Sequence, residues 1–378
     1  MRVCVLTSSF PCRSDDTAGT FVYSQVTRLA DVVRIDVVHA QRDGLHPYAA
    51  EAFVRRPVHN PFRTRHMSRV RGFDSVHAVP LCASMVRAAF VGGPYDLYHA
   101  YWAIPAGFVG SLVKGRRPLV VWLGGSDINV FSVRPGFREA VRWSLRCATR
   151  VIAVSHDLLE KAISLGLDPR RGTVIPSGVD TDLFRPVDSA IVRRRLGLPD
   201  GFLFVCVGSL LPGKRVDRLI RIVAGLPRGL DCFLIVVGDG PERQTLEQTA
   251  AEAAGRVVFL GHLANNCVAE VVAACDAFVM ASESEGLPTS VQEAMSCGLP
   301  VVAMDVGGLH EIVIDGEVGF LARDEAQMHH LMRKMATASA GVPGMGDRAR
   351  SLAQTRLSVD LSVQRTLEVY RQALEETG

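Results

Sequence analysis

Short apolar runs alternate with helix-forming segments along this chain, and the whole pattern occurs twice. In the first half, RVCVLTSS and PLVVWLGGSD have the continuous apolar character of strands that are buried on both faces. The pattern restarts at GFLFVCVGSL and continues through DCFLIVVGDG. Because strands that alternate with helices form βαβ units around a parallel sheet, the sequence predicts two doubly wound α/β domains.

The predicted domain boundary lies in a stretch rich in proline and charge that begins at Asp180. We expect a first Rossmann-like domain at residues 1–186, a second at 187–358, and an amphipathic C-terminal helix at 359–378 that packs back on the first domain. Ligands of such sheets bind at the carboxyl ends of the strands, so two facing domains place the expected site in the cleft between them.

Composition excludes several classes of protein. The 378 residues are 48% hydrophobic and 21% charged, as in ordinary globular enzymes. Nine cysteines without a C-x-x-C pair argue against a disulfide framework or a zinc site. The sequence shows neither a signal peptide nor an apolar run of about twenty residues, and the net charge of +3 comes with no nucleic-acid motif. We therefore expect a cytoplasmic protein that does not bind nucleic acid.

The segment SESEGLPTSVQEAM, residues 282–295, has the strongest functional pattern. Glu285 precedes a helix that Pro288 is expected to open, and Glu293 lies within it. The first amides of this helix would point toward an anion such as a phosphate. Two carboxylates on either side of a phosphate suit a ligand with hydroxyls at both ends, such as a nucleotide sugar. Ser290 and Glu293 also spell a capping box, and the spacing leaves both interpretations open.

With these motifs, the chain resembles the retaining glycosyltransferases of family 4, which have the GT-B fold. The family signature E-x7-E matches Glu285 and Glu293, and VGGLHEIVIDGEVGFL matches the pattern that follows it. Further matches are SSFP, VIPSGVDTDLF, VGSLLPGKRVDRLI and VVGDGPER, so the similarity extends over essentially the whole chain. The stretch YHAYWAIPAGF looks most like the branch that acts on cell-envelope polysaccharides of the teichuronic-acid type.

The resemblance implies a role for each matching residue. Lys214 would hold the diphosphate and stabilise the leaving group, and Glu285 would bind the donor sugar; these two are the implied catalytic residues. Glu293 would bind the ribose, and Gly19 would let the first loop approach the phosphates. The full implied donor-binding set is Gly19, Ser209, Lys214, Arg215, Gly261, His262, Leu263, Glu285, Gly286, Leu287, Pro288, Thr289, Ser290 and Glu293.

Two positions depart from the family pattern. Ser209 stands where an arginine is common, and Gly124 stands where a histidine is expected. Retaining transfer lets the leaving diphosphate take the acceptor proton, so loss of the histidine need not abolish activity. Asp180 and Asp182 spell the D-x-D metal motif of another glycosyltransferase fold, but aspartates in such a loop commonly cap turns. We expect no metal and no other cofactor.

Three features of the first domain have two interpretations each. His99 either lines the cleft or is packed in the core, and Asp127 either contacts acceptor or sugar or caps a helix. Six arginines without an acid between residues 55 and 71 either contact an anionic membrane or form a solvated face; they are Arg55, Arg56, Arg63, Arg65, Arg69 and Arg71. Arg138, Arg142, Arg146 and Arg150 recur at helical spacing, and we interpret this stripe as a solvated face.

The sequence thus predicts a metal-independent retaining glycosyltransferase that moves a sugar from a nucleotide-diphosphate sugar to a glycan, a lipid-linked or a small-molecule acceptor. Its place would be the cytoplasm, with peripheral association at the inner face of the cytoplasmic membrane through the six arginines. Alternatives are a sugar-nucleotide epimerase of GT-B fold, a natural-product glycosyltransferase, and a degenerate protein that binds nucleotide sugars without turning them over.

Overall fold

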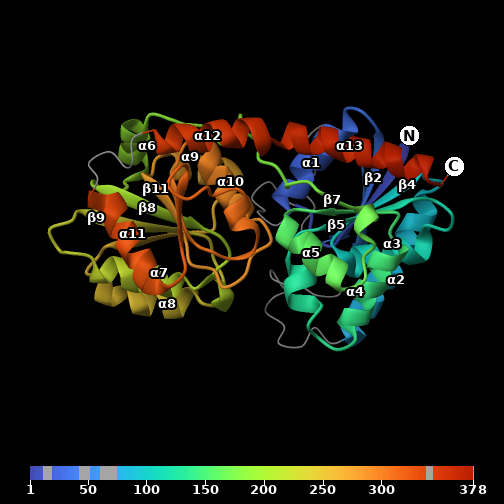
Figure 1. Cartoon of the computed structure of the whole chain (residues 1–378), viewed down its shortest axis with the longest axis horizontal. Coiled ribbons are helices and arrows are strands. Elements are labelled where there is room, and N and C mark those ends of the chain that lie inside the picture. The colour runs from blue at the N-terminus through green and yellow to red at the C-terminus, as the bar shows by residue number, and fades with distance from the viewer. Residues whose placement is uncertain (12–18, 42–51, 60–74, 338–343, 378) are drawn as a thin grey trace. The chain divides into compact units, whose positions relative to one another are not determined.

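The computed structural model describes residues 1–11, 19–41, 52–59, 75–337 and 344–377. Its contacts divide the chain into two compact units. Unit 1 comprises Met1–Ser177 and Val359–Gly378, and unit 2 comprises Gly178–Ser358. Each unit is built on its own parallel sheet, as the repeated apolar runs predict (Figure 1).

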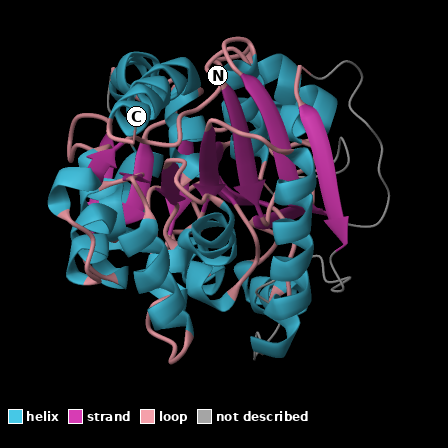
Figure 2. Ribbon diagram, turned by 90° about the vertical axis from the view of Figure 1, so that its right-hand side faces the viewer, coloured by secondary structure: helices cyan, strands magenta, loops and turns pink. Residues whose placement is uncertain are grey.

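Unit 1 is a doubly wound α/β domain. Its seven parallel strands have the order β3-β2-β1-β4-β5-β6-β7, and Figure 2, which looks onto the side of this unit, shows helices on both faces of the strands. The strands are β1 (Arg2–Thr7), β2 (Arg34–Gln41), β3 (Val54–His59), β4 (Leu97–Tyr101), β5 (Leu119–Leu123), β6 (Arg150–Ala153) and β7 (Gly172–Val174). The helices are α1 (Thr20–Ala30), α2 (Ser75–Gly92), α3 (Phe108–Val113), α4 (Phe137–Cys147), α5 (His156–Ser164) and α13 (Val359–Glu375).

Unit 2 repeats this architecture with six parallel strands in the order β10-β9-β8-β11-β12-β13. The strands are β8 (Phe202–Val207), β9 (Cys232–Val237), β10 (Val257–Gly261), β11 (Ala277–Met280), β12 (Val301–Met304) and β13 (Gly319–Ala322). The helices are α6 (Ser189–Leu196), α7 (Val216–Gly225), α8 (Arg243–Ala250), α9 (Asn265–Ala273), α10 (Thr289–Ser296), α11 (Glu325–Thr337) and α12 (Met345–Arg356). The central strands are fully buried, which explains why they read as continuous apolar runs.

The C-terminal helix α13 belongs to unit 1, where it packs on α1 and β5. A buried polar network joins it to the sheet. Gln25 of α1 donates to Ser362 Oγ of α13 at 3.0 Å and to the carbonyl of Ser177 at 2.6 Å, and it accepts from the hydroxyl of Tyr101 at 2.7 Å. The polar groups that α13 buries therefore have partners, as burial requires.

The boundary between the units lies after Ser177, earlier than the expected division at 186/187. The backbone just after the boundary is bonded within unit 2: Val179 N donates to Leu357 O at 2.8 Å. Further along, Phe184 O accepts from Ser296 Oγ at 2.6 Å. Proline and charge thus mark a segment that packs along unit 2 rather than a free linker.

Strand β3 was not expected from the sequence. Its residues VRRPVH combine arginine with proline, a composition that strand interiors avoid but sheet edges tolerate. Among the described strands, β3 is indeed an edge strand and pairs with β2 alone. Arg56 forms an ion pair at 2.6 Å with the buried carboxylate of Asp36, and Arg55 lies over the ring of Phe10. Arg63, Arg65, Arg69 and Arg71 lie outside the described residues.

Within the described part of the chain, no helix is both long enough and apolar enough to span a bilayer.

Candidate functional site

A pocket opens at the carboxyl ends of β8, β9 and β11 in unit 2. It is shallow and open to solvent, and its wall includes Gly208, Ser209, Lys214 and Ser282. Ser282 Oγ is buried there and has no hydrogen-bond partner among the described residues. A concave site at the carboxyl edge of a doubly wound sheet is where such folds bind their ligands.

Lys214 and Glu285 form an ion pair at this edge, with Lys214 Nζ 2.6 Å from Glu285 Oε1. Lys214 follows β8 and Glu285 follows β11, which are neighbours in the sheet. The Lys214 side chain is 33% exposed and that of Glu285 is 11% exposed. A cation and a carboxylate that the sequence predicts to bind one ligand therefore lie within hydrogen-bond distance of each other.

Backbone contacts fix the loop that carries Glu285. Glu283 N donates to Gly213 O at 2.9 Å, which joins this loop to the one that carries Lys214. On the other side, Gly308 N donates to Gly286 O at 2.9 Å. A Cβ on Gly307 would lie 2.2 Å from Glu285 O, and Gly307 has a φ of +56°, so only glycine fits there. Gly307 thus positions the site, although the sequence analysis assigned it no role.

Arg215 is the neighbouring cation, and it already has carboxylate partners. Its Nη1 lies 2.6 Å from Glu283 Oε1, and its Nε lies 3.1 Å from Asp217 Oδ1. These two carboxylates raise the pKa of the guanidinium. Arg215 has a φ of +47°, a backbone conformation that these contacts help to hold. The geometry favours a positioning role for Arg215 over direct contact with a diphosphate.

Helix α10 begins at Thr289, with Pro288 as its N-cap residue. No side chain caps this helix, so the capping box of Ser290 and Glu293 does not form. Pro288 thus lies one position before the first helical position that was expected for it. The amides of Thr289 and Ser290 are in the first turn, where the positive end of the helix dipole attracts anions. Leu287, just before the helix, is buried.

Glu293 is half-buried on α10. Loss of solvent raises the pKa of its carboxyl to about 7. The side chain makes no capping bond to the start of α10. Its role as a ligand of the ribose therefore stays a prediction.

The remaining residues of the expected donor set lie at other strand ends. Gly261, with a φ of +73°, ends edge strand β10, and the exposed His262 and the half-buried Leu263 follow it. In unit 1, Gly19 has a φ of +79°, and a Cβ there would lie 2.5 Å from Ser9 O. Gly19 is therefore required by the packing of its own loop.

Gly124 has no room for a larger residue. A Cβ at this position would lie 2.5 Å from the ring of Trp122 and 3.0 Å from Trp102 Nε1. Trp122 also stacks on Phe21, with ring centroids 5.0 Å apart. The space that a histidine would occupy here is thus filled by an aromatic cluster, which explains in physical terms how the chain departs from the family pattern.

Asp127 is fully buried and accepts three backbone hydrogen bonds. The amides of Ala103, Gly125 and Ile128 donate to its carboxylate at 3.0, 3.0 and 3.1 Å. Burial raises the pKa of this carboxyl, while the three amides lower it. The carboxylate ties the loop after β4 to the loop after β5, which favours the structural interpretation.

His99 is also fully buried. Its Nδ1 lies 2.5 Å from the hydroxyl of Tyr370 on α13, and its ring stacks on Tyr101 at 4.5 Å. Burial lowers the pKa of the imidazole to about 3, so the ring is neutral at physiological pH. The structure favours the packed histidine over one that lines a cleft. Tyr370, which the sequence analysis passed over, is its partner.

The D-x-D sequence forms a turn. Asp180 Oδ1 accepts from the amides of Asp182 and Leu183, both at 3.1 Å. Among the residues that the structure describes, no three His, Cys, Asp or Glu side chains come together as metal ligands.

Family models match both units. The model "Glycosyltransferase Family 4" matches residues 18–183, and "Glycosyl transferases group 1" matches residues 188–341. A D-inositol 3-phosphate glycosyltransferase of Acidothermus cellulolyticus is 30% identical to this chain over 96% of it and 87% of that protein. The chain belongs to glycosyltransferase family 4.

Other relatives match over a shorter span. The putative teichuronic acid biosynthesis glycosyltransferase TuaC of Bacillus subtilis is 36% identical over 57% of this chain and 55% of that protein. An N-acetyl-alpha-D-glucosaminyl L-malate synthase of Bacillus anthracis is 29% identical, and the match spans 61% of its length. The chain thus matches less than two thirds of the length of these two curated relatives.

Solved structures have the same fold. Anabaena HepE, solved in complex with UDP and glucose, matches with a TM-score of 0.78 and 25% identity over 98% of this chain and all of that one. Sucrose-phosphate synthase of Thermosynechococcus elongatus matches with a TM-score of 0.85 and 21% identity over the full length of both chains. Both units are thus Rossmann-like domains of a GT-B protein.

Proposed function

We propose that the chain is a retaining glycosyltransferase that moves a sugar from a nucleotide-diphosphate sugar to an acceptor hydroxyl. The Lys214–Glu285 ion pair beside the start of α10 is the observation that supports this most strongly. A half-buried cation, a carboxylate and a helix N-terminus meet at one sheet edge. Together they match a diphosphate that carries a sugar.

In this proposal, binding of the donor breaks the ion pair between Lys214 and Glu285. Lys214 turns to the diphosphate and stabilises the charge that develops on it as the sugar leaves. Glu285 then accepts hydrogen bonds from the sugar hydroxyls, and Glu293 accepts them from the ribose. The backbone of Gly286, Leu287 and Pro288 lines the sugar, and Gly261, His262 and Leu263 contact the nucleobase.

Retention follows from transfer on one face of the sugar, with the leaving diphosphate as the base for the acceptor proton. Such a step asks for positive charge on the departing phosphates and for no strong protein base. Lys214 and the first amides of α10 supply this charge, so we propose a metal-independent enzyme without a resident cofactor. Chelation with EDTA is expected to leave the transfer rate unchanged, and restoration of a lost rate by Mg²⁺ or Mn²⁺ would contradict this.

The names of the relatives suggest the class of acceptor. They include a putative teichuronic acid biosynthesis glycosyltransferase and a D-inositol 3-phosphate glycosyltransferase. We propose a glycan, a lipid-linked or a small-molecule acceptor in polysaccharide, glycolipid or other glycoconjugate biosynthesis. We also propose that the enzyme works in the cytoplasm and associates peripherally with the inner face of the cytoplasmic membrane.

A panel of nucleotide sugars tests the proposal, beginning with UDP-glucose because HepE was solved with UDP and glucose. The expected result is a higher melting temperature with one donor and release of its nucleotide when an acceptor is added. Conversion of the donor without an acceptor, seen by product analysis, would identify an epimerase. A shift in melting without nucleotide release under any acceptor would identify a binding protein.

A further inference from the structure

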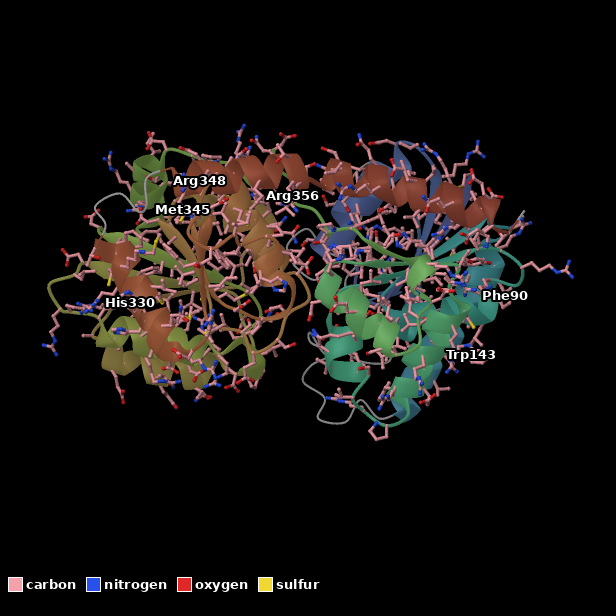
Figure 3. The ribbon with its side chains drawn as sticks, viewed as in Figure 1. Phe90, Trp143, His330, Met345, Arg348 and Arg356 are labelled. Atoms are coloured by element: carbon pink, nitrogen blue, oxygen red, sulfur yellow. The ribbon has the colours of Figure 1, made fainter. Side chains whose placement is uncertain are left out.

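Unit 1 exposes several large apolar side chains on three adjacent helices. Helix α3 packs between α2 and α4. Phe90 on α2 is 63% exposed, Leu112 on α3 is 53% exposed and Trp143 on α4 is 51% exposed. Figure 3 labels Phe90 and Trp143 on the same side of unit 1. We call this surface the α2–α4 face; its exposed large apolar residues are Val79, Phe90, Val91, Leu112 and Trp143.

The outer stripe of α2 is unusual for a helix at a protein surface. Val79, Ala83, Arg87, Phe90 and Val91 recur at helical spacing and are all exposed, and four of the five are apolar. A solvated helix normally presents polar residues on this side. Exposed apolar groups of this size that recur on one face indicate a surface that meets something other than water.

The same helices and the loop after α3 also carry cations. The exposed ones are Arg87, Arg116, Arg117, Arg138 and Arg146. No acid occurs between residues 75 and 95 or between 97 and 126, and Glu139 is the single acid of α4. Helices α2, α3 and α4 and the loop after α3 therefore carry more cations than acids.

The structure also changes the interpretation of the arginine stripe: Arg138, Arg142 and Arg146 lie on α4, whereas Arg150 is the first residue of β6. Leu145 is buried, whereas the exposed Trp143 lies beside Arg142 and Arg146. The stripe thus combines cations with an exposed indole ring. A face that meets only water gains nothing from an exposed indole ring, so Trp143 argues against the interpretation of the stripe as a solvated face.

We propose that the α2–α4 face binds the headgroup region of an anionic lipid bilayer. Phe, Leu and Trp insert at the boundary between headgroups and acyl chains, and arginines bind lipid phosphates while their methylene stems lie along apolar surface. The proposal rests on the proposed function only for the expectation that the enzyme works at a membrane. It moves the contact away from Arg55 and Arg56, which are engaged within unit 1.

Charge argues for lipid over a second copy of this chain. A symmetric dimer through this face would set arginines of one copy against arginines of the other, and like charges oppose such contact. An anionic bilayer offers both the opposite charge and the apolar layer that the exposed side chains require.

Vesicle flotation of the full chain tests this. One set of vesicles contains phosphatidylglycerol and phosphatidylcholine, and the other contains phosphatidylcholine alone. The wild type is expected to bind the anionic set and to be released by high salt. Replacing two cations, in Arg138→Gln/Arg146→Gln, is expected to weaken binding about tenfold or more. Phe90→Ser/Trp143→Ser is expected to reduce binding at all salt concentrations.

The matched control lies in unit 2. Ile191 on α6 is 63% exposed, like Phe90, and the exposed Arg194 is near it. Ile191→Ser/Arg194→Gln removes one apolar and one basic group and is expected to bind vesicles like the wild type. Equal binding by the face variants and the wild type, or no binding by the wild type, would overturn the proposal.

Two further readouts separate the remaining explanations. Tryptophan emission is expected to shift to the blue on anionic vesicles in the wild type and much less in Trp143→Phe. Loss of a dimer in the face variants, measured by light scattering, would replace lipid with a second copy as the occupant. Stabilisation by UDP-glucose is expected to be the same in face variants and wild type. Its absence from all of them would count against the proposed function and leave the vesicle result standing.

Discussion

Lys214 Nζ lies 2.6 Å from Glu285 Oε1, although 71 positions separate the two residues in the chain. The contact joins the loop after β8 to the loop after β11, which are adjacent strands. Each side chain therefore satisfies the other in the absence of a ligand. In the proposed complex, the donor replaces this contact with one from Lys214 to the diphosphate and one from Glu285 to the sugar. The effect of the pair on donor binding can therefore be measured with variants of either residue.

Lys214→Ala is expected to reduce kcat/KM for transfer by roughly 100-fold or more, because the leaving diphosphate loses its cation. The free energy of unfolding is expected to fall by about 1 kcal/mol or less, because the pair is partly solvent-exposed. Steady-state kinetics and urea unfolding measure the two effects. The exchange Lys214→Glu/Glu285→Lys retains the ion pair, so recovery of transfer in this variant would mean that the pair has only a structural role.

Glu285→Gln is expected to separate the sugar from the nucleotide. A carboxylate that accepts from sugar hydroxyls contributes about 1.5–3 kcal/mol through charged hydrogen bonds, so affinity for the sugar donor falls while affinity for the free nucleotide hardly changes. Calorimetric titration with UDP-glucose and with UDP measures both. Equal losses for the two ligands would contradict the assignment of Glu285 to the sugar.

Glu293 is expected to make both stability and nucleotide affinity depend on pH. Its carboxyl has a pKa raised to about 7 by burial, whereas an unfolded glutamate titrates near 4.5. The folded protein therefore retains a proton that the unfolded chain releases. This contribution to stability is present at low pH and is lost as the pH rises from about 4.5 to 7.

Nucleotide affinity is expected to change in the opposite direction, because the charged carboxylate is the better acceptor for ribose hydroxyls. Melting curves with and without UDP, recorded between about pH 5 and pH 8, measure both trends. Glu293→Gln removes the titrating group and is expected to flatten both. If Glu293→Gln shows the same pH dependence of stability and UDP affinity as the wild type, Glu293 is not the cause of that dependence.

Gly124→Ala is expected to destabilise the protein by about 1–3 kcal/mol, because the new methyl group meets the ring of Trp122. Gly229→Ala is the matched control, since a Cβ there meets no atom within 4 Å. Urea unfolding compares the two variants. Similar stabilities would show that Trp122 moves aside easily and that the aromatic cluster does not determine residue 124.

Tyr370→Phe is expected to cost about 1–3 kcal/mol of stability, because the buried His99 Nδ1 loses its hydrogen-bond partner. Transfer kinetics are expected to remain unchanged, since His99 is packed in the core. Tyr98→Phe removes a hydroxyl from β4, the strand that carries His99, and is the control. A fall in kcat without a fall in stability would return His99 to the list of candidates for catalysis.

Sequence patterns predicted the two α/β units because buried parallel strands such as β8 are continuously apolar. They missed β3, because at a sheet edge arginine and proline replace that pattern. Local motifs also failed at the start of α10, where the backbone conformation determines which residue is the N-cap. Pro288 takes that position, so Ser290 lies inside the helix and forms no capping box. Long-range contacts such as that between Lys214 and Glu285 depend on strand order, which apolar periodicity does not encode.

Unit 2 is an uninterrupted stretch of chain, whereas unit 1 consists of two pieces that are separated by it. The last piece, α13, carries Ser362 and Tyr370, the partners of Gln25 and His99. During synthesis the second unit has all its residues before the first one does. The order of translation is thus the reverse of the order of completion, and a ribosome that stalls before α13 leaves Gln25 and His99 without the hydrogen-bond partners that this helix supplies.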